Sequence, residues 1–150
     1  MESTPVGREC ADGLERVAKE LERRPTSFDF FQAVRLLERL HPERAAVGDF
    51  VEPSTEVVHF GVNPSIAFPA SDVFALATSE DGDAPAHMTV NFMGLVGPAG
   101  VLPYEYSLLA TERRRAKDGA LLAFFDLFHH RIISLFYRAW RKYRFTADYE

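Results

Sequence analysis

Apolar residues recur at helical spacing near the start of the chain. Between residues 11 and 24 they share one face, which predicts a first helix. A second apolar stripe predicts a helix over residues 28–40. We expect Thr26 to cap this helix with Asp29 at its third position, and we expect Pro42 to end it.

Two further helix patterns cover residues 104–117 and 119–142 at the end of the chain. On the longer one, an apolar stripe follows 4-3-4-3-4 spacing: Leu121, Phe125, Phe128, Ile132, Leu135 and Ala139. A second, adjoining stripe consists of Leu122, His129, Ile133, Phe136 and Trp140. Its predicted polar strip is narrow and consists of Asp126, His130, Ser134, Arg138 and Arg141. Because this helix is apolar over most of its circumference, it must be covered on several sides.

The middle of the chain has short apolar runs instead, separated by Pro, Asn and Gly. These runs predict short strands or extended segments at residues 56–60, 65–68, 72–76 and 88–93. A glycine-rich loop follows at residues 94–100. We therefore predict an α+β fold with N-terminal helices, a small irregular sheet of short strands, and a long aromatic-rich C-terminal helix. Residues 1–150 are expected to form a single domain, with residues 1–10 disordered.

The composition is that of a folded protein from a reducing compartment. Apolar side chains make up 47% of the 150 residues, which excludes disorder, and the single cysteine, Cys10, excludes a disulfide scaffold. The longest stretch without charged residues, 84–104, is interrupted by Pro and Gly, so we expect no membrane span there. The N-terminus lacks the apolar region of a signal peptide, and we expect a soluble cytoplasmic protein.

Charge is distributed unevenly along the chain, whose net charge is −5. Residues 111–145 hold nine Lys or Arg and three Asp or Glu, so this segment is +6 and the remainder is −11. The two parts can pair internally or bind different partners. The basic cluster at residues 113–117 allows an alternative function as a nucleic-acid or anion-binding module. The acidic chain and the lack of a nucleic-acid motif favour a solvated or protein-facing patch.

Residues that could carry chemistry do not form a coherent site in the sequence. The glycines of the 94–100 loop lack phosphate-binding spacing, and prolines remove amides that such a loop would use. His129 and His130 point about 100° apart on a helix, so Asp126 with His130 is the better-spaced pair, and it lacks a third metal ligand. The alternative is that His129 packs in the aromatic face while His130 forms hydrogen bonds at its edge. We predict no catalytic, cofactor or metal site and no enzymatic activity.

Aromatic and arginine side chains crowd the last helix. These residue types are enriched in the hot spots of protein interfaces. They equally suit a domain core with arginines at its rim. From the sequence we favour core packing over direct contact with a partner, although both can hold on different faces of the helix.

Four segments resemble the signatures of one family. They are residues 29–38 (DFFQAVRLLE), 63–71 (NPSIAFPAS), 91–103 (NFMGLVGPAGVLP) and 126–140 (DLFHHRIISLFYRAW). In this order they are similar to the TssG family (also called ImpH or VasB), a baseplate subunit of bacterial type VI secretion systems. The resemblance extends from about residue 28 to residue 144. Family chains are longer, which implies that this chain corresponds to an N-terminal portion.

The resemblance implies a structural scaffold without catalysis. In the family, one TssG joins two TssF chains in a wedge that also carries TssK and TssE, and six wedges surround the hub of the spike. We therefore expect TssF-like (two copies), TssK-like and TssE-like partners, no nucleic acid and no direct membrane insertion. The expected location is the cytoplasmic face of the inner membrane, where the baseplate supports sheath assembly and contraction.

The interface or structural residues expected from these patterns and this resemblance lie in the four segments. The loop from Gly94 to Pro103 is expected to position its neighbours. The full set is Phe30, Phe31, Phe68, Gly94, Gly97, Pro98, Gly100, Pro103, Phe128, His129, His130, Arg131, Phe136, Tyr137, Arg138 and Trp140.

Overall fold

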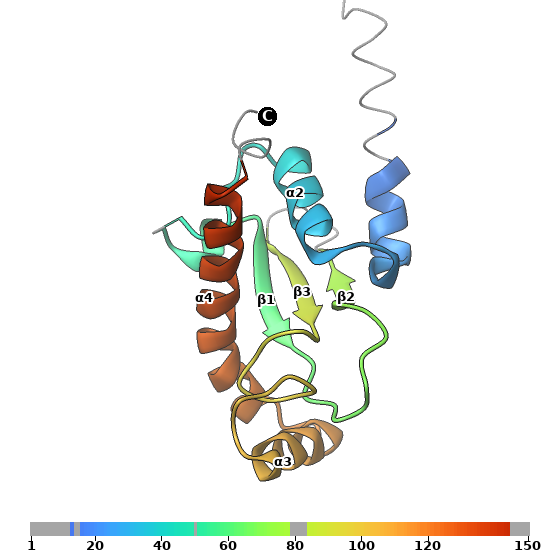
Figure 1. Ribbon diagram of the computed structural model, residues 1–150, viewed down its shortest axis with the longest axis vertical. Coiled ribbons are helices and arrows are strands. Elements are labelled where there is room, and N and C mark those ends of the chain that lie inside the picture. The colour runs from blue at the N-terminus through green and yellow to red at the C-terminus, as the bar shows by residue number, and fades with distance from the viewer. Residues whose placement is uncertain (1–12, 14–15, 50, 79–83, 145–150) are drawn as a thin grey trace, which may run out of the picture.

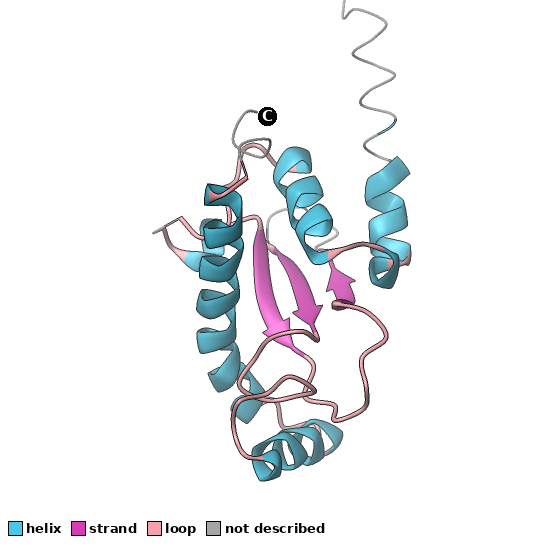
Figure 2. Ribbon diagram, in the orientation of Figure 1, coloured by secondary structure: helices cyan, strands magenta, loops and turns pink. Residues whose placement is uncertain are grey.

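The computed structural model describes residue 13 and residues 16–49, 51–78 and 84–144. A helical stretch at 16–23 comes first. The elements that follow are η1 (Pro25–Ser27), α2 (Phe30–Leu40), η2 (Pro53–Thr55), β1 (Val58–Val62), β2 (Val73–Ala77), β3 (Ala86–Val90), α3 (Tyr104–Arg115) and α4 (Ala120–Lys142). This α+β order, with its small sheet and long last helix, confirms the predicted fold class (Figures 1 and 2). Cys10 and the expected disordered residues 1–10 lie outside the described residues.

Helix α2 begins two residues later than predicted because Asp29, rather than Thr26, caps it. The Asp29 carboxylate accepts a hydrogen bond from the backbone N–H of Phe31 at 2.9 Å. Thr26 lies inside the 3-10 turn η1, which Pro25 opens. The helix ends at His41, whose N–H donates to the carbonyl of Leu37.

The sheet is mixed and has three strands in the order β1-β3-β2. β1 runs parallel to β3, with Phe60 opposite Met88, and β2 runs antiparallel to β3 with a bulge between Val73 and Ala75. Side chains alternate between the two faces, as strand geometry requires. One face is buried and contributes Val58, Phe60, Val62, Val73, Met88 and Val90 to the core. The other face carries the half-exposed or exposed side chains of His59, His87 and Thr89.

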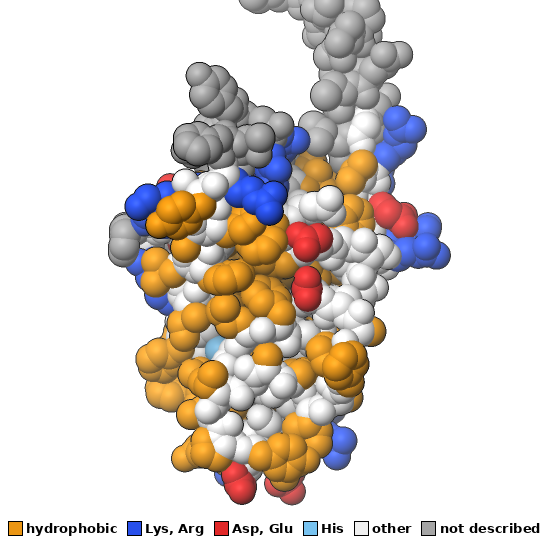
Figure 3. Space-filling view, in the orientation of Figure 1, with side chains coloured by type: hydrophobic (Ala, Val, Ile, Leu, Met, Phe, Trp, Pro, Cys, Tyr) orange, Lys and Arg blue, Asp and Glu red, His pale blue; other side chains and the backbone are white. Residues whose placement is uncertain are grey.

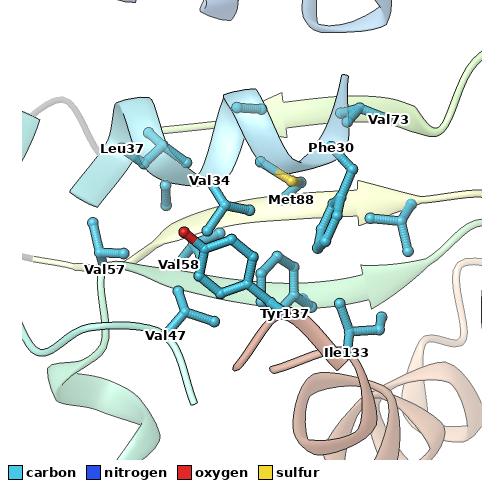
Figure 4. Close-up of a cluster of buried hydrophobic side chains, with 14 of the residues drawn as sticks. Phe30, Val34, Leu37, Val47, Val57, Val58, Val73, Met88, Ile133 and Tyr137 are labelled. Atoms are coloured by element: carbon cyan, nitrogen blue, oxygen red, sulfur yellow. The ribbon is translucent and has the colours of Figure 1, made fainter. Parts of the chain in front are cut away.

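Helix α2 covers the buried face, and Tyr137 of α4 reaches in beside it (Figure 4). Phe30, Val34 and Leu37 are the residues of α2 that point into this core. Burying each such side chain contributes about 1.5–3 kcal/mol of free energy to folding. The core therefore depends on the apolar stripe that the sequence pattern identified.

The strands differ from the prediction at their ends. β1 begins two residues later than the predicted run 56–60. β3 begins two residues earlier than the predicted run 88–93. β3 ends at Val90, and the side-chain amide of the next residue, Asn91, donates to the carbonyl of Ser71 at 3.0 Å. Residues 65–68 form no strand, since Pro64 and Pro69 flank them and Ser65 donates its N–H to the Asn63 side chain.

Helix α4 lies alongside β1, an edge strand of the sheet (Figure 1), and α3 lies at the far end of the molecule. The inward side of α4 combines the second predicted apolar stripe with part of the predicted polar strip, while most of the first stripe faces outward. The side toward the fold buries Phe125, His129, His130, Ile133, Ser134 and Tyr137. His130 and Ser134 belong to the predicted polar strip. The physical reason for the inward position of His130 is that the neighbouring strand edge needs polar partners.

Candidate protein-docking surface

The outward side of α4 is apolar. Its large exposed side chains are Phe124, Leu127, Phe128, Ile132, Leu135 and Phe136. Leu127 is 66% exposed and Phe128 is 48% exposed. We call this set the α4 outer face. Figure 3 shows hydrophobic side chains along the α4 side of the molecule and again at the α3 end. Contiguous exposed apolar side chains of this size mark interaction sites on proteins.

His130 explains why a polar residue faces inward. Its Nδ1 accepts a hydrogen bond from the backbone N–H of Phe60, at 3.3 Å, so it satisfies an amide on the edge of β1. An edge amide left without a partner beside a packed helix would cost about 1–3 kcal/mol. Because Nδ1 is the acceptor, the neutral ring carries its proton on Nε2, which lies 3.7 Å from Oε2 of Glu56. This bond fixes the rotation of α4 relative to the sheet.

Burial keeps this histidine neutral. Desolvation, with the nearby His59 and Arg131, lowers the pKa of His130 from the ordinary value of 6.5 to about 4. Glu56 is 1% exposed, and its desolvation raises its pKa. Burial therefore disfavours the charged forms of both side chains, and they do not form a strong ion pair. The hydrogen bond that the sequence led us to expect of His130 is present, and the residue that makes it is buried.

His129 links α4 to the glycine-rich loop. Its Nδ1 lies 2.8 Å from Oδ1 of Asp126, and its Nε2 accepts a hydrogen bond from the N–H of Leu95 at 2.9 Å. Asp126 thus pairs with His129 and not with His130, because the i,i+3 neighbour is the one that shares its side of the helix here. Among the described residues, no His, Cys, Asp or Glu side chains form a group of three or more that could bind a metal ion.

The glycine-rich loop is a compact turn on the fold. An isolated parallel bridge pairs Gly94 with Gly100, and the N–H of Gly97 donates to Oγ of Ser107 on α3. Gly97 has φ +92, and an added Cβ would lie 2.2 Å from the carbonyl oxygen of Asn63. Only glycine fits this position. Pro98 is half-buried within the turn, and the exposed Pro103 is the N-cap of α3. These contacts show a loop that connects α3, α4 and β1.

A second set of bonds holds the C-terminal half of α4. The Tyr137 hydroxyl donates to Oε2 of Glu38 on α2 at 2.8 Å, and Arg141 lies 3.5 Å from Oε1 of the same carboxylate. Arg138 donates to the carbonyl of Gly48 at 3.0 Å. Burial and the Glu38 carboxylate raise the pKa of Tyr137, so its hydroxyl stays a donor. These bonds attach α4 to α2 and to the loop after it.

Aromatic rings form the contact between α2 and α4. The Trp140 ring stacks on the Phe31 ring with centroids 4.2 Å apart. The centroid of the Phe136 ring lies 5.8 Å from that of Phe31. Tyr137 is fully buried, with its ring edge-on to Phe30. The four predicted residues Phe30, Phe31, Tyr137 and Trp140 therefore act in packing, while Phe136 is shared between packing and the α4 outer face.

The other predicted residues lie outside this contact. Phe68 is 95% exposed on the β1–β2 connection, and Arg131 is half-buried on α4 next to the α4 outer face. The basic cluster 113–117 occupies the exposed end of α3, where Arg113 forms a salt bridge to Asp118 at 3.0 Å. The cluster lies on a solvated helix end, as expected from the sequence.

Sequence reasoning missed two carboxylates that bind inside the fold, the buried Glu56 and the half-buried Glu38. Both were read as parts of a helix surface or of a strand pattern, since charged residues are rarely buried. Nothing in the local pattern singled out Glu38, which stands between Leu37 and Arg39 on a helix with other charged residues. Glu56 opens an apolar run that enters the sheet, which is a weak signal.

Helix α4 also passes a test for membrane-spanning helices by length and composition, with 23 residues. The membrane-span prediction from the sequence covered residues 84–104 and not this helix. In the structure, α4 packs on β1 and carries buried histidines that bind the fold, as core helices of globular proteins do. Its apolar side therefore faces outward from a folded unit.

A folded unit that turns polar side chains inward and large apolar ones outward is typical of a subunit of a larger protein assembly. The family model described as "Type VI secretion, TssG" matches residues 24–150. The chain belongs to the TssG family, as the four sequence segments indicated. No curated protein and no solved structure matches it. TssG proteins are structural components of the type VI secretion baseplate and are not a known enzyme family.

Proposed function

We propose that this chain is a structural adaptor of the type VI secretion baseplate wedge and that it joins other subunits through the α4 outer face. The partners we propose are TssF-like chains, in two copies, with TssK-like and TssE-like subunits around the spike hub. The complex would lie at the cytoplasmic face of the inner membrane and support sheath assembly and contraction. The observation that carries this proposal is the row of exposed large apolar side chains on a helix whose rotation is fixed by buried polar bonds.

A scaffold works through area and shape, and this surface offers both. Apolar side chains that become buried in an interface each contribute free energy in proportion to the area removed from water. The aromatic members, Phe124, Phe128 and Phe136, are residue types that dominate interface energetics. The bonds of His130 and Tyr137 hold the helix rigid, so little conformational entropy is lost on docking.

Co-expression of this chain with the TssF-like, TssK-like and TssE-like chains of the same source tests the proposal. We expect the tagged chain to retain the TssF-like subunit and expect Phe128→Ser to reduce this retention strongly. Phe74→Ser is the matched control, because Phe74 is the same residue type at 47% exposure on β2, away from α4. If the wild-type chain retains no baseplate subunit, or if both variants behave like wild type, the α4 outer face is not the docking surface.

A further inference from the structure

We propose that helix α3 docks into a groove of another baseplate subunit. This groove is apolar where it meets the first two turns of α3 and acidic where it meets the last turn. The inference rests on the proposed function, and it adds a second contact to the one at the α4 outer face. It follows from which side chains of α3 the fold buries and from the charges at the C-terminal end of this helix.

Helix α3 turns small side chains toward the fold and large ones away from it. Its buried residues are Ser107 and Ala110. The large apolar side chains of the helix are all between 40% and 55% exposed: Tyr104, Tyr106, Leu108 and Leu109. A helix that packs on its own domain typically buries a stripe of large apolar residues. The apolar surface of α3 is therefore available for a partner to cover.

Polar contacts fix the position of α3. The N–H of Gly97, in the constrained turn, donates to Oγ of Ser107 at 3.1 Å, and the Thr111 hydroxyl donates to the carbonyl of Pro64 at 3.0 Å. The helix lies at the end of the molecule, beyond the sheet (Figure 1). Because these contacts orient α3 without using its large side chains, little conformational entropy is lost when a partner covers them.

The spread of the apolar side chains favours a groove over a flat surface. At about 100° per residue, the four apolar side chains from Tyr104 to Leu109 extend over about 200° of the helix circumference. A flat surface covers one side of a helix, whereas a groove contacts several sides at once, as in the recognition of amphipathic helices. Because α3 has 12 residues, the proposed groove is about 18 Å long.

The C-terminal end of α3 carries basic side chains that the fold does not pair. Arg113 forms its salt bridge with Asp118. Glu105 lies in the first turn of α3, so Glu112 is the single carboxylate of the helix close to its basic end. Within the described part of the chain, no ion pair is formed by the three other exposed bases at this end: Arg114, Arg115 and Lys117. A partner that meets this end favourably therefore presents Asp or Glu.

Three other occupants fit these observations less well. In an antiparallel pair of two copies, the apolar turns of each α3 would meet the basic turn of the other, for which Glu105 offers only one carboxylate. A parallel pair would place the bases of both copies together. An anionic bilayer typically attracts clusters of about four to eight bases. The net charge of −5 opposes approach to nucleic acid.

Site-specific photo-crosslinking in the co-expressed complex tests the proposal. A benzophenone amino acid replaces Leu108 in the middle of α3, and the control carries it at His87, which is exposed on the sheet face away from the core. We expect the residue at position 108 to cross-link to a peptide of another baseplate subunit. The control should not label that peptide.

The other results of this experiment overturn the inference. Cross-links from position 108 to a second copy of this chain, to lipid or to nucleic acid exclude the proposed occupant. An intact complex without cross-links at position 108 shows that α3 is not covered by a partner. In these cases the α4 outer face can still hold the complex, and the proposed function stands. Failure of the complex to form removes both.

A charge variant tests the acidic end of the groove. Lys117→Glu should weaken binding of the purified subunit that position 108 labels by about three- to tenfold at low salt and by less at high salt. Lys19→Glu is the matched control, because Lys19 is an exposed lysine on the helical stretch 16–23, away from α3 (Figure 1). Equal effects of the two variants, or a loss that does not depend on salt, would contradict an acidic partner surface.

Discussion

The bond between Tyr137 and Glu38 is the clearest test of how α4 is anchored. The Tyr137 hydroxyl is buried and donates to a carboxylate oxygen at 2.8 Å, and a Tyr137→Phe change removes this bond while keeping the ring that packs in the core. Hydrogen bonds to charged groups contribute about 1.5–3 kcal/mol. The other Glu38 oxygen still accepts from the Val47 N–H at 3.0 Å and lies near Arg141, so the carboxylate keeps partners. We therefore expect Tyr137→Phe to lower the free energy of unfolding by an amount in the lower part of this range, about 2 kcal/mol.

For a chain of this length, a loss of about 2 kcal/mol lowers Tm by about 4–8 °C. Thermal and urea unfolding measure it directly. Tyr143→Phe is the matched control, because it is the same chemical change at the end of the same helix in a side chain that is 80% exposed. The control should stay within about 0.5 kcal/mol of wild type. If Tyr137→Phe unfolds like Tyr143→Phe, the hydroxyl does not anchor α4 and the reasoning is refuted.

Two further predictions concern pH and the glycine-rich loop. The depressed pKa of His130 means that the unfolded state binds the proton first as pH falls below about 6.5, so stability present at pH 7 is lost on the way to pH 4. His130→Asn keeps an acceptor for the β1 amide but does not titrate. Between pH 7 and pH 5, urea unfolding should show that the variant loses about 2 kcal/mol less free energy of unfolding than the wild type does. Parallel pH profiles of the two proteins would contradict this. Gly97→Ala should destabilise by at least about 2 kcal/mol, because its Cβ would meet the Asn63 carbonyl, whereas Gly119→Ala, with open space around its Cβ, should change Tm little. Equal melting of the two glycine variants would show that the turn is not constrained at residue 97.

The helices were predictable from the sequence because their apolar periodicity is a local signal. α4 begins one residue from its predicted start and ends where predicted, at Lys142. Strand ends were less predictable: β3 stops at Val90, and the side chain of Asn91 then bonds to a segment 20 residues away. Short strands carry few residues of pattern, so a shift of two residues leaves the pattern almost unchanged.

The rotation of α4 could not be read from its own sequence. Periodicity identifies stripes on a helix, but which stripe faces inward depends on what lies opposite. Here the element opposite is the edge of β1, whose Phe60 amide lies 70 residues from His130 in sequence. The sequence predicted two apolar stripes and one polar strip, and it could not show that the polar residues His130 and Ser134 face the sheet. The candidate site shared this limit, since the α4 outer face is visible only once the inner face is known.

This orientation connects the stability of the fold to its proposed role. Turning α4 about its axis by half a turn would bury Phe128 and Leu135, but it would leave the buried Phe60 amide without His130 and would remove the Tyr137 donor from the Glu38 carboxylate. An orphaned buried amide costs about 1–3 kcal/mol, and the loss of a hydrogen bond to a charged group costs about 1.5–3 kcal/mol. The apolar gain would be of similar size, at about 1.5–3 kcal/mol for each side chain fully buried. The polar bonds decide the orientation because they are directional, whereas apolar burial can be satisfied by any covering surface. The apolar side chains left outside contribute favourable free energy only when another subunit covers them. A scaffold subunit with this arrangement can therefore fold first and assemble afterwards.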